Sequence, residues 1–258
     1  MADESRRITD LSAGKLRRLM SRLAERQGTA EAIPRAPRGG ALPLSFAQER
    51  LWFLDRLGAG GAAYHVPASV RLRGPLDALA LERTLGALVS RHEALRTAFS
   101  EADGRPVQTV LAGVDLPLPR IDLETLPEDL RAEELARIVR DEAVRPFDLA
   151  RAPLLRAALV RLGPEEHRLA LTFHHIVTDG WSLGVLVREV AALYPGFASG
   201  SPAVLPELPI QPADHAVWER QRGEAFAAGL AFWRERLAGL PPLELPADRP
   251  RPATPSFR

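Results

Sequence analysis

Apolar residues recur with two different periods along the chain, and each change of period predicts a new secondary-structure element. Continuous or alternating apolar runs predict strands at 64–72, 95–99, 107–111, 154–162 and 167–177. Spacings of three and four residues predict helices at 76–89, 128–144 and 182–197. The elements interleave without the regular rhythm of a doubly wound sheet. We therefore expect an α/β protein of the α+β kind, with helices packed on a mixed sheet.

Turn residues connect several of these elements. Asp103 and Gly104 are typical of a tight hairpin turn between two strands, and Gly163-Pro164 separates the next strand pair. The simplest arrangement of that second pair is an antiparallel hairpin. Ser45 predicts the N-cap of a helix whose leucines face inward and which ends before a cluster of glycines. The inward-facing leucines are Leu51, Leu54 and Leu57.

Both ends of the chain differ in composition from the middle. In residues 1–40, Ser12 is a candidate cap for a basic amphipathic helix, and residues 28–40 resemble a linker. Such a leader can dock another polypeptide or fold back on its own domain. Ten of the 23 prolines lie between Pro202 and Pro255. A helix is still predicted within 213–240, and its aromatic residues need a partner surface.

Composition narrows the class of protein. The 258 residues carry a formal net charge of +1, which favours neither nucleic acid nor a membrane surface as partner. No cysteine is present, so disulfides and a thiol nucleophile are excluded, and the chain suits a reducing cytosol. No apolar run reaches the length of a membrane span, and the first residues do not resemble a signal peptide. We expect a soluble cytoplasmic protein.

Residues 169–184, LALTFHHIVTDGWSLG, combine an apolar strand with a group of chemically capable side chains. His174 and His175 lie at the end of the strand and, because side chains alternate, must face opposite sides of the sheet. Asp179 follows in the turn, and Gly180 permits a conformation or a close approach that a side chain would prevent. One histidine is therefore expected in the interior and the other toward a second surface.

Four interpretations of this stretch are compatible with its residue types. Histidines that face apart cannot share a metal ion, and no other ligand cluster completes a site, so no metal is expected. Ser182 lies in a G-x-S-x-G pattern typical of hydrolases, but the acid and histidine that should follow it are missing from their usual order. A single imidazole acting as a general base and a pair of structural core histidines both remain open.

Residues 174–180, HHIVTDG, resemble the HHxxxDG motif of the condensation domains of nonribosomal peptide synthetases, which share the chloramphenicol acetyltransferase fold. Three more segments resemble this family in the expected order: LSFAQERLWFLDRL at 44–57, RHEALRTAF at 91–99 and IQPADHAVWERQ at 210–221. The motif alone is shared by several acyltransferases, whereas four ordered motifs are specific. The resemblance covers all of the chain except the leader.

The resemblance implies an acyltransferase that forms an amide bond between two thioesters held on the phosphopantetheine arms of donor and acceptor carrier proteins. His175 would position or deprotonate the acceptor amine, and His174 would be structural. Asp179 would hold the turn through an ion pair with an arginine, and Gly180 would keep the approach to the thioester open. The remaining residues of the expected site are supporting: Trp181, Ser182, Arg91 and Arg96. The dense polar block at 91–97 that contains the two arginines is predicted to be structural. Neither a metal nor a bound cofactor is implied.

Departures from the family pattern shape the remaining expectations. Family members have two lobes, so we expect residues 41–212 to form the N-terminal lobe and 213–258 to begin the second. An isolated fragment of this kind would be inactive, and Asp179 without its arginine would be a buried carboxylate with a raised pKa. Pro212 and His215 stand where the family more often has aromatic residues. Alternatives are a free CoA-dependent acyltransferase and a non-catalytic scaffold in which residues 1–27 dock an upstream synthetase subunit.

Overall fold

The computed structural model describes residues 32–58, 61–201, 203–241, 243 and 246, and the helix expected near the N-terminus lies outside them. The chain divides into Met1–Pro34 and a second compact unit, Arg35–Arg258. The lobe boundaries expected at residues 41 and 213 stay predictions. The backbone N–H of Ala36 and the side chain of Arg38 both bind Asp214, which ties this segment to the main unit. Within the described residues, no helix is long and apolar enough to cross a membrane.

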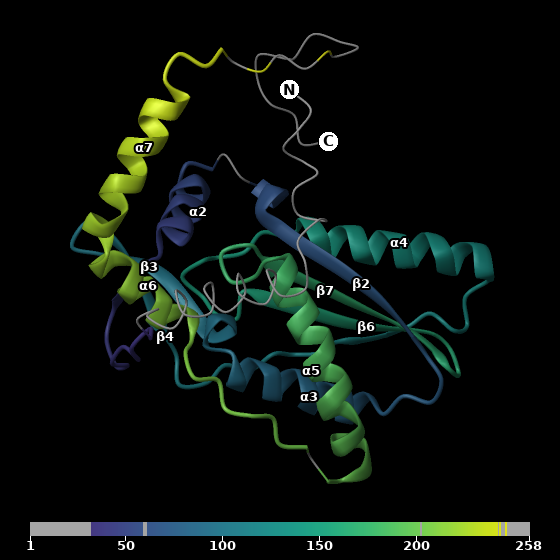
Figure 1. The fold of residues 1–258 in the computed structure, drawn as a ribbon. Helices are drawn as coiled ribbons and strands as arrows, with labels where there is room; N and C mark the ends of the chain where they lie inside the picture. The colour runs from purple at the N-terminus through teal and green to yellow at the C-terminus, as the bar shows by residue number, and fades with distance from the viewer. Residues whose placement is uncertain (1–31, 59–60, 202, 242, 244–245, 247–258) are drawn as a thin grey trace, which may run out of the picture. The chain divides into compact units, whose positions relative to one another are not determined.

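Two sheets form the framework of this unit (Figure 1). The larger sheet has the order β2-β7-β6-β5, from β2 (His65–Arg73), β7 (Glu166–His174), β6 (Leu155–Gly163) and β5 (Arg120–Asp122). Its first three strands are antiparallel and β5 joins β6 in parallel, which confirms the mixed sheet. The smaller sheet has the order β1-β4-β3, from β1 (Leu42–Pro43), β4 (Arg105–Val110) and β3 (Thr97–Ala102). The hairpin of β3 and β4 thus forms its own sheet, which the strand pattern alone does not predict.

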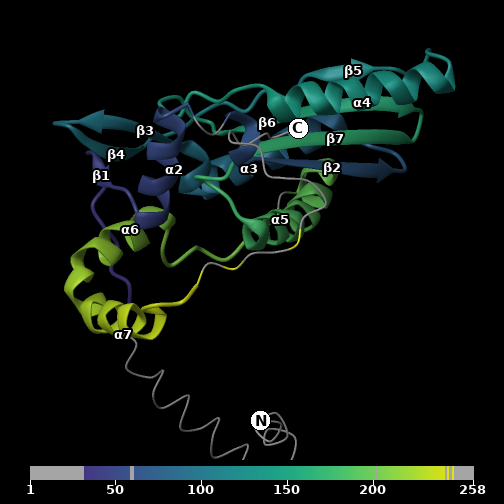
Figure 2. The same ribbon diagram turned by 90° about the horizontal axis from the view of Figure 1, so that it is seen from above.

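Helices cover both faces of the larger sheet (Figures 1 and 2). On one face, α3 (Ala78–Arg91) and α5 (Gly180–Ser199) enclose a core that includes Leu85, Leu159 and Phe173. On the other face, α4 (Glu128–Val144) packs Ile138 against Val160 of β6. Strands β6 and β7 are therefore buried on both sides, as their near-continuous apolar sequences predict.

Local signals in the sequence account for several element boundaries. Asp103 (φ 51°) and Gly104 (φ 73°) form the β3–β4 turn, and both adopt the left-handed conformation that a two-residue hairpin requires. Helix α2 (Phe46–Arg56) begins at a capping box in which Ser45 and Gln48 exchange hydrogen bonds. The inward orientation expected for Leu57 is wrong, because α2 ends one residue earlier and this side chain is 61% exposed.

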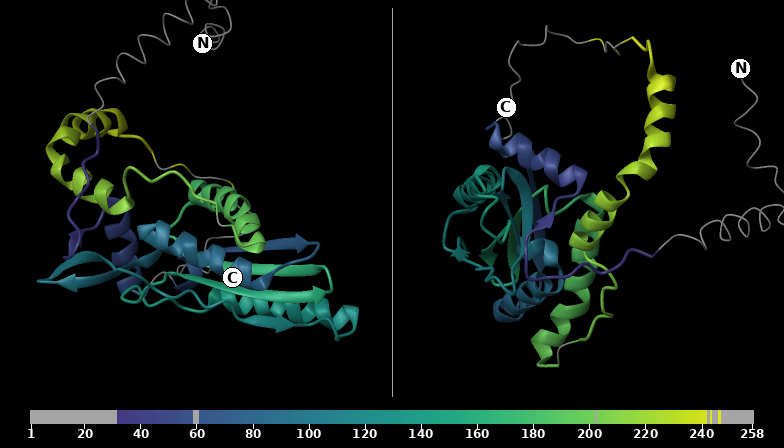
Figure 3. Two further views of the ribbon diagram at one scale, coloured as in Figure 1. Left: turned by 90° about the horizontal axis from the view of Figure 1, so that it is seen from below. Right: turned by 90° about the vertical axis from the view of Figure 1, so that its left-hand side faces the viewer.

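The single helix expected within 213–240 is wrong. Helix α6 (Pro212–Gln221) is followed by a 3-10 turn, Gly223–Phe226, and then by α7 (Ala227–Leu237). Glycine is a poor helix former, and it interrupts the helical pattern at residue 223. Helix α6 packs against β1, and α7 extends away from the sheets, which the two views of Figure 3 show. The apolar residues of α7 stay exposed.

Candidate active site

The site lies in the turn between β7 and α5, and the residues that directly precede β6 and β2 hold this turn in place. The backbone N–H of His174 donates to Leu154 O (3.0 Å), and that of His175 donates to Tyr64 O (2.8 Å). The backbone N–H of Val177 then donates back to His174 O (3.1 Å), which turns the chain away from the sheet. Strand β7 therefore ends at His174 and not at residue 177, the end that its apolar sequence predicts.

His174 is a buried structural histidine with only 2% of its surface exposed. It lies opposite His65 in the β2–β7 register and packs edge-on against the rings of His65 and Phe147. Its Nδ1 accepts a hydrogen bond from the backbone N–H of Ile176 (3.1 Å), so this nitrogen is unprotonated. Burial, and then the neighbouring charges of His65 and His175, lower its pKa to about 4. The ring is therefore neutral at physiological pH.

His175 faces the other way and is exposed, which confirms that the two rings face apart. Its Nδ1 lies 2.7 Å from the carbonyl oxygen of Thr178 and must donate to it, because a carbonyl oxygen only accepts. The proton of the neutral ring is thereby assigned to Nδ1, and Nε2 keeps its lone pair. The side chain is held by its own turn, and its basic nitrogen stays available.

Asp179 caps α5, and within the described residues no arginine forms an ion pair with it. Its Oδ1 accepts hydrogen bonds from the Ser182 hydroxyl (2.6 Å) and the Ser182 backbone N–H (2.8 Å). These two bonds, in that order, lower the pKa of the Asp179 carboxyl. The carboxylate is exposed, so the prediction of a buried group with a raised pKa is wrong: a helix N-terminus provides the partners that an arginine would otherwise supply.

Gly180 is not required by the backbone of this turn. Its φ lies outside the left-handed region, and a Cβ at this position would meet no atom within 4 Å. The expectation that a special conformation or a close neighbour demands glycine is wrong for the described residues. The empty space beside Gly180 is still compatible with a substrate that approaches from outside.

An open groove of about 780 Å³ lies beside the turn. Its walls come from four segments that are distant in the sequence: the turn with His175, helix α2 with Gln48, the 91–97 block with Ala94, and the start of α6 with Pro212. Trp181 also lines the groove and is 80% exposed. The groove therefore brings together all four motifs found in the sequence, at 44–57, 91–99, 174–180 and 210–221.

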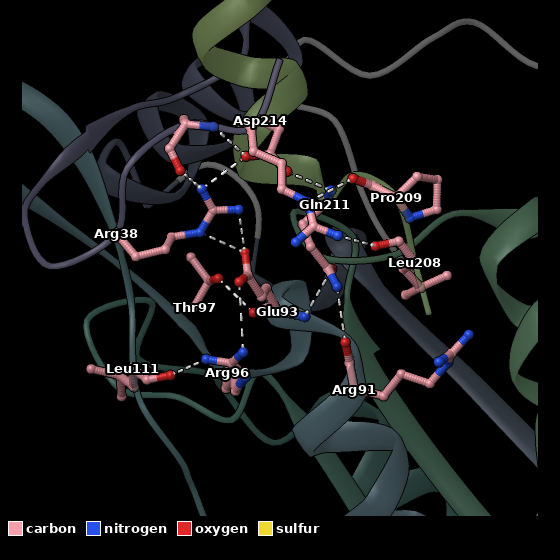
Figure 4. A network of polar contacts seen from close by, with 12 residues as sticks. Arg38, Arg91, Glu93, Arg96, Thr97, Leu111, Leu208, Pro209, Gln211 and Asp214 are labelled. Atoms are coloured by element: carbon pink, nitrogen blue, oxygen red, sulfur yellow. Dashed lines mark hydrogen bonds and ion pairs between the residues drawn. The ribbon is translucent and has the colours of Figure 1, made fainter. Parts of the chain in front are cut away.

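A polar network holds the α6 wall of the groove in place (Figure 4). Asp214, 1% exposed, accepts hydrogen bonds from Ala36 N (2.8 Å), Arg38 Nη1 (2.8 Å) and Gln211 N (2.7 Å). Burial pushes the pKa of this carboxyl upward, but the hydrogen bond from Arg38 and those from the two backbone N–H groups outweigh it, so the pKa is lowered. Arg38 also binds Glu93, as Figure 4 shows. The charged carboxylate thus joins the 35–38 segment to the first turn of α6.

The polar block at 91–97 is structural, as predicted. Arg91 binds Glu189 of α5 (Nε–Oε1 3.1 Å) and the carbonyl of Pro206 (2.7 Å). Arg96 donates to the carbonyls of Leu111 and Ser90. The backbone carbonyl of Arg91 also accepts a hydrogen bond from Gln211 Nε2 (3.0 Å), and Gln211 lines the groove, so the block supports both the scaffold and one wall of the groove.

The metal and hydrolase interpretations find no support in the geometry. No group of three or more metal-binding side chains occurs within the described residues. The Ser182 hydroxyl donates to Asp179, and the nearest motif imidazole, His175, is hydrogen bonded to a carbonyl. Ser182 is part of the first turn of α5, and within the described residues its hydroxyl is part of the Asp179 cap and has no hydrogen bond to a histidine.

Sequence reasoning missed two residues of the site. Asp214 looks like an ordinary polar residue of a helix, and only the arginine-containing segment folded onto it reveals its burial. Thr178 is 7% exposed, and its carbonyl orients His175, a role that any residue type can fill. The sequence offered one signal for the position of Asp214: Pro212 followed by an acidic residue is typical of the first turn of a helix.

The comparisons with known proteins agree on one family. The sequence model of the Condensation domain matches residues 39–258. The phosphinothricin tripeptide synthetase PhsC of Streptomyces viridochromogenes is 46% identical over 259 residues, which is 98% of this chain and 24% of that protein. Chondramide synthase of Chondromyces crocatus is 47% identical over 241 residues, covering 92% of this chain and 6% of that protein. The chain thus spans less than a quarter of the length of these relatives.

Solved structures give the same answer. The X-domain in complex with OxyB from teicoplanin biosynthesis is 33% identical, with a TM-score of 0.77 over 88% of this chain and 50% of that one. The first condensation domain of the calcium-dependent antibiotic synthetase, solved with a substrate analogue, is 28% identical, with a TM-score of 0.68 over 79% of this chain and 49% of that one. The fold, the four ordered motifs and these similarities lead to one conclusion: the chain belongs to the condensation domain family of nonribosomal peptide synthetases.

Proposed function

We propose that this chain carries the site at which a nonribosomal peptide synthetase forms an amide bond between two carrier-bound substrates. The observation that supports this function is the position of His175: Nδ1 is hydrogen bonded to Thr178 O, which makes Nε2 the basic nitrogen of the neutral ring, and the residue lines an open groove. A fixed basic nitrogen beside an accessible groove is what acyl transfer to an amine needs.

In the proposed reaction the acceptor amine attacks the carbonyl carbon of the donor thioester. The C–N bond forms, the C–S bond breaks, and the proton lost by the amine ends on the sulfur of the released thiol. His175 Nε2 accepts that proton from the amine and returns it to the thiolate. An aliphatic amine is a stronger base than imidazole, so the ring also contributes by holding the amine against the thioester. In this scheme no acyl group is transferred to the enzyme, because the amine attacks the thioester directly.

The proposed partners are donor and acceptor carrier domains, whose phosphopantetheine arms bring the thioesters to His175. The chain itself needs no bound cofactor in this scheme. Two of its relatives are named as a tripeptide synthetase and a nonribosomal peptide synthetase, which supports carrier-bound substrates. The proposed location is the cytoplasm, in keeping with the absence of cysteine. Docking of an upstream subunit through residues 1–27 remains a proposal about a segment outside the described residues.

A free CoA-dependent acyltransferase fits the groove less well. CoA carries nucleotide phosphates, which proteins bind with arginine or lysine side chains. The residues that line the His175 groove in the described part of the chain include neither. Consumption of acetyl-CoA in the presence of an amine acceptor would overturn this assignment.

A binding role is the second candidate. One of the solved structures that resemble this chain is titled as a complex of an X-domain with OxyB, so one member of this structural group has been captured with a protein partner. Exposed apolar side chains on α7 offer a surface for such a role here, among them Phe232 and Trp233. If the chain only binds a partner, a variant without His175 should still bind that partner. If the chain is a catalyst, the same variant should no longer form the amide product.

The test of catalysis replaces His175 in the whole synthetase. His175→Asn keeps a side-chain donor near the Thr178 carbonyl but has no basic nitrogen, and we expect the rate of amide formation between two loaded carrier proteins to fall at least about 100-fold. His167→Gln, at the other end of β7, is the matched control and should keep the rate. Normal turnover by His175→Asn would refute the proposal.

The same assay examines the two-lobed arrangement that the resemblance implies. The solved condensation domains are about twice as long as their match to this chain. Product from the whole synthetase but not from the 258-residue chain supports a site completed by a second lobe. Full turnover by the 258-residue chain alone would contradict it.

A further inference from the structure

His215 is a second imidazole in the groove that His175 lines, and it comes from a different segment, helix α6. The residue is exposed, and Pro212, three residues earlier, lines the same groove. Residues three apart lie on one face of a helix, so this face of α6 borders the groove. An imidazole at position 215 is not part of the family pattern, which more often has an aromatic residue there. Its role is therefore a question about this chain.

Buried neighbours fix the rotation of α6 and with it the direction of His215. Asp214 is 1% exposed and belongs to the polar network of Figure 4, and Ala213 and Ala216 are buried as well. Consecutive residues of a helix point about 100° apart, so the burial of residue 214 keeps residue 215 on the outer side. The ring also packs against that of Trp218, with 5.6 Å between the ring centroids. A firmly held helix thus supports His215 at the groove.

Most other polar side chains of the groove already have protein partners. Gln48, Gln211 and Ser182 each make a hydrogen bond to another residue, and Nδ1 of His175 is bound too. The ring of His215 differs, because within the described residues neither of its nitrogens is hydrogen bonded. A neutral imidazole offers one N–H donor and one acceptor. Nε2 of His175 and the ring nitrogens of His215 are therefore available to a ligand.

The carbonyl oxygen of a thioester-bound aminoacyl group suits a free imidazole nitrogen. That oxygen only accepts hydrogen bonds, and the N–H of an imidazole donates one. A hydrogen bond that is equally strong before and during the reaction holds the substrate without changing the barrier of the chemical step. Such a bond lowers KM and leaves kcat unchanged, which separates this role from the role proposed for His175.

We propose that His215 is a substrate-binding residue of the groove: its ring N–H donates a hydrogen bond to the carbonyl oxygen of one carrier-bound aminoacyl group and holds that group beside His175. The inference rests on the proposed condensation function and deepens it. The two imidazoles then divide the work, since His175 Nε2 handles the proton of the amine and His215 fixes the position of one reactant.

The test measures condensation by the whole synthetase and determines kcat and KM separately for the donor and the acceptor carrier protein. His215→Phe keeps an aromatic ring next to Trp218 and removes both nitrogens, and His215→Gln restores a side-chain N–H donor. Gln221→Phe makes a similar change from a polar to an aromatic side chain at the exposed end of α6, outside the groove, and is the control. Thermal unfolding shows whether each variant is folded, and His215→Ala replaces His215→Phe if the latter is not.

We expect His215→Phe to raise KM for one of the two carrier proteins at least about fivefold and to change kcat less than about twofold. His215→Gln should bring KM back to within about twofold of the wild-type value, and Gln221→Phe should change neither constant. Unchanged KM in folded His215→Phe, equal rises for both carriers, a fall in kcat alone, or no recovery in His215→Gln would each overturn the inference.

Calorimetric binding of an alanyl pantetheine amide to the same proteins separates this inference from the proposed function. If the wild-type protein forms no amide product but binds the probe, and His215→Phe binds it at least about fivefold more weakly, the role of His215 stands and the condensation function fails. If the two proteins bind the probe equally, or neither binds it, the inference is wrong even where condensation occurs. Pantetheine without the alanyl group is the second probe: an equal effect of His215→Phe on its affinity would place the hydrogen bond on the arm and overturn the assignment to the aminoacyl carbonyl.

Discussion

Replacing His174 with asparagine should remove a specific pH dependence of stability. The ring is 2% exposed, and its Nδ1 accepts a hydrogen bond from the Ile176 N–H. The Oδ1 atom of an asparagine at this position would lie close to the position of Nδ1 and would accept the same hydrogen bond. Asparagine does not titrate. His174→Asn therefore keeps the hydrogen bond that shapes the turn, loses the ring contacts with His65 and Phe147, and removes one protonation site.

The size of the effect follows from the pKa of His174. That pKa is lowered to about 4 in the folded protein, against about 6.5 in an unfolded chain. Between these values the unfolded state binds the proton and the folded state does not, so this group's stability contribution is complete above pH 6.5 and is lost as the pH falls toward 4. Each pKa unit is worth about 1.4 kcal/mol, which gives a loss of about 3 kcal/mol over this range.

Urea unfolding at pH 4 to 8 measures the free energy of unfolding of both proteins. All other titrating groups are common to the two, so the difference between the curves isolates residue 174. We expect the wild-type protein to be the more stable near pH 7 because of its ring contacts, and the difference to fall by about 3 kcal/mol by pH 4. A difference that stays constant with pH would show that the His174 ring titrates normally in the folded state, and the burial argument would fail.

Three further predictions concern the turn and the α6 wall. Asp214→Ala should lower the free energy of unfolding by about 3 kcal/mol, because it leaves Arg38 without one of its two carboxylate partners. The control Glu207→Gln removes a charge from an exposed ion pair and should leave the midpoint of urea unfolding unchanged. Equal effects of the two substitutions would contradict the stabilising role of the Asp214 network. Asp179→Ala should lower the free energy of unfolding by about 1 kcal/mol, because α5 loses its N-cap, and Asp179→Asn should keep most of that stability. Thermal unfolding measures both variants, and an Asp179→Ala variant as stable as the wild type would refute the capping role. Gly180→Ala should raise the free energy of unfolding by about 0.5 kcal/mol, because the φ of residue 180 lies outside the left-handed region and an added Cβ would meet no atom within 4 Å. A stable variant with slowed condensation would place the substrate beside residue 180. A destabilised variant would contradict the open space described around this residue.

Much of the local structure is predictable because its causes lie within a few residues. The Asp103-Gly104 turn, the Ser45 cap and the hairpin around Gly163 follow from backbone preferences and short-range hydrogen bonds. The alternation of side chains along β7 is enough to put the two histidines on opposite faces of the sheet. Two short strands, Leu42–Pro43 and Arg120–Asp122, were not predicted, because two or three residues carry no detectable period.

The sequence by itself determined the order of the elements, the opposite orientation of His174 and His175, and the family to which the four motifs belong. Only the tertiary structure decided which ring is neutral and buried, where the Asp179 carboxylate finds its partners, and that Asp214 is buried against Arg38. The physical reason is the distance along the chain over which each interaction acts. Periodicity and capping act between neighbours in the chain, whereas burial, pKa shifts and the walls of a groove depend on segments such as 35–38 and 210–221 that meet only after folding.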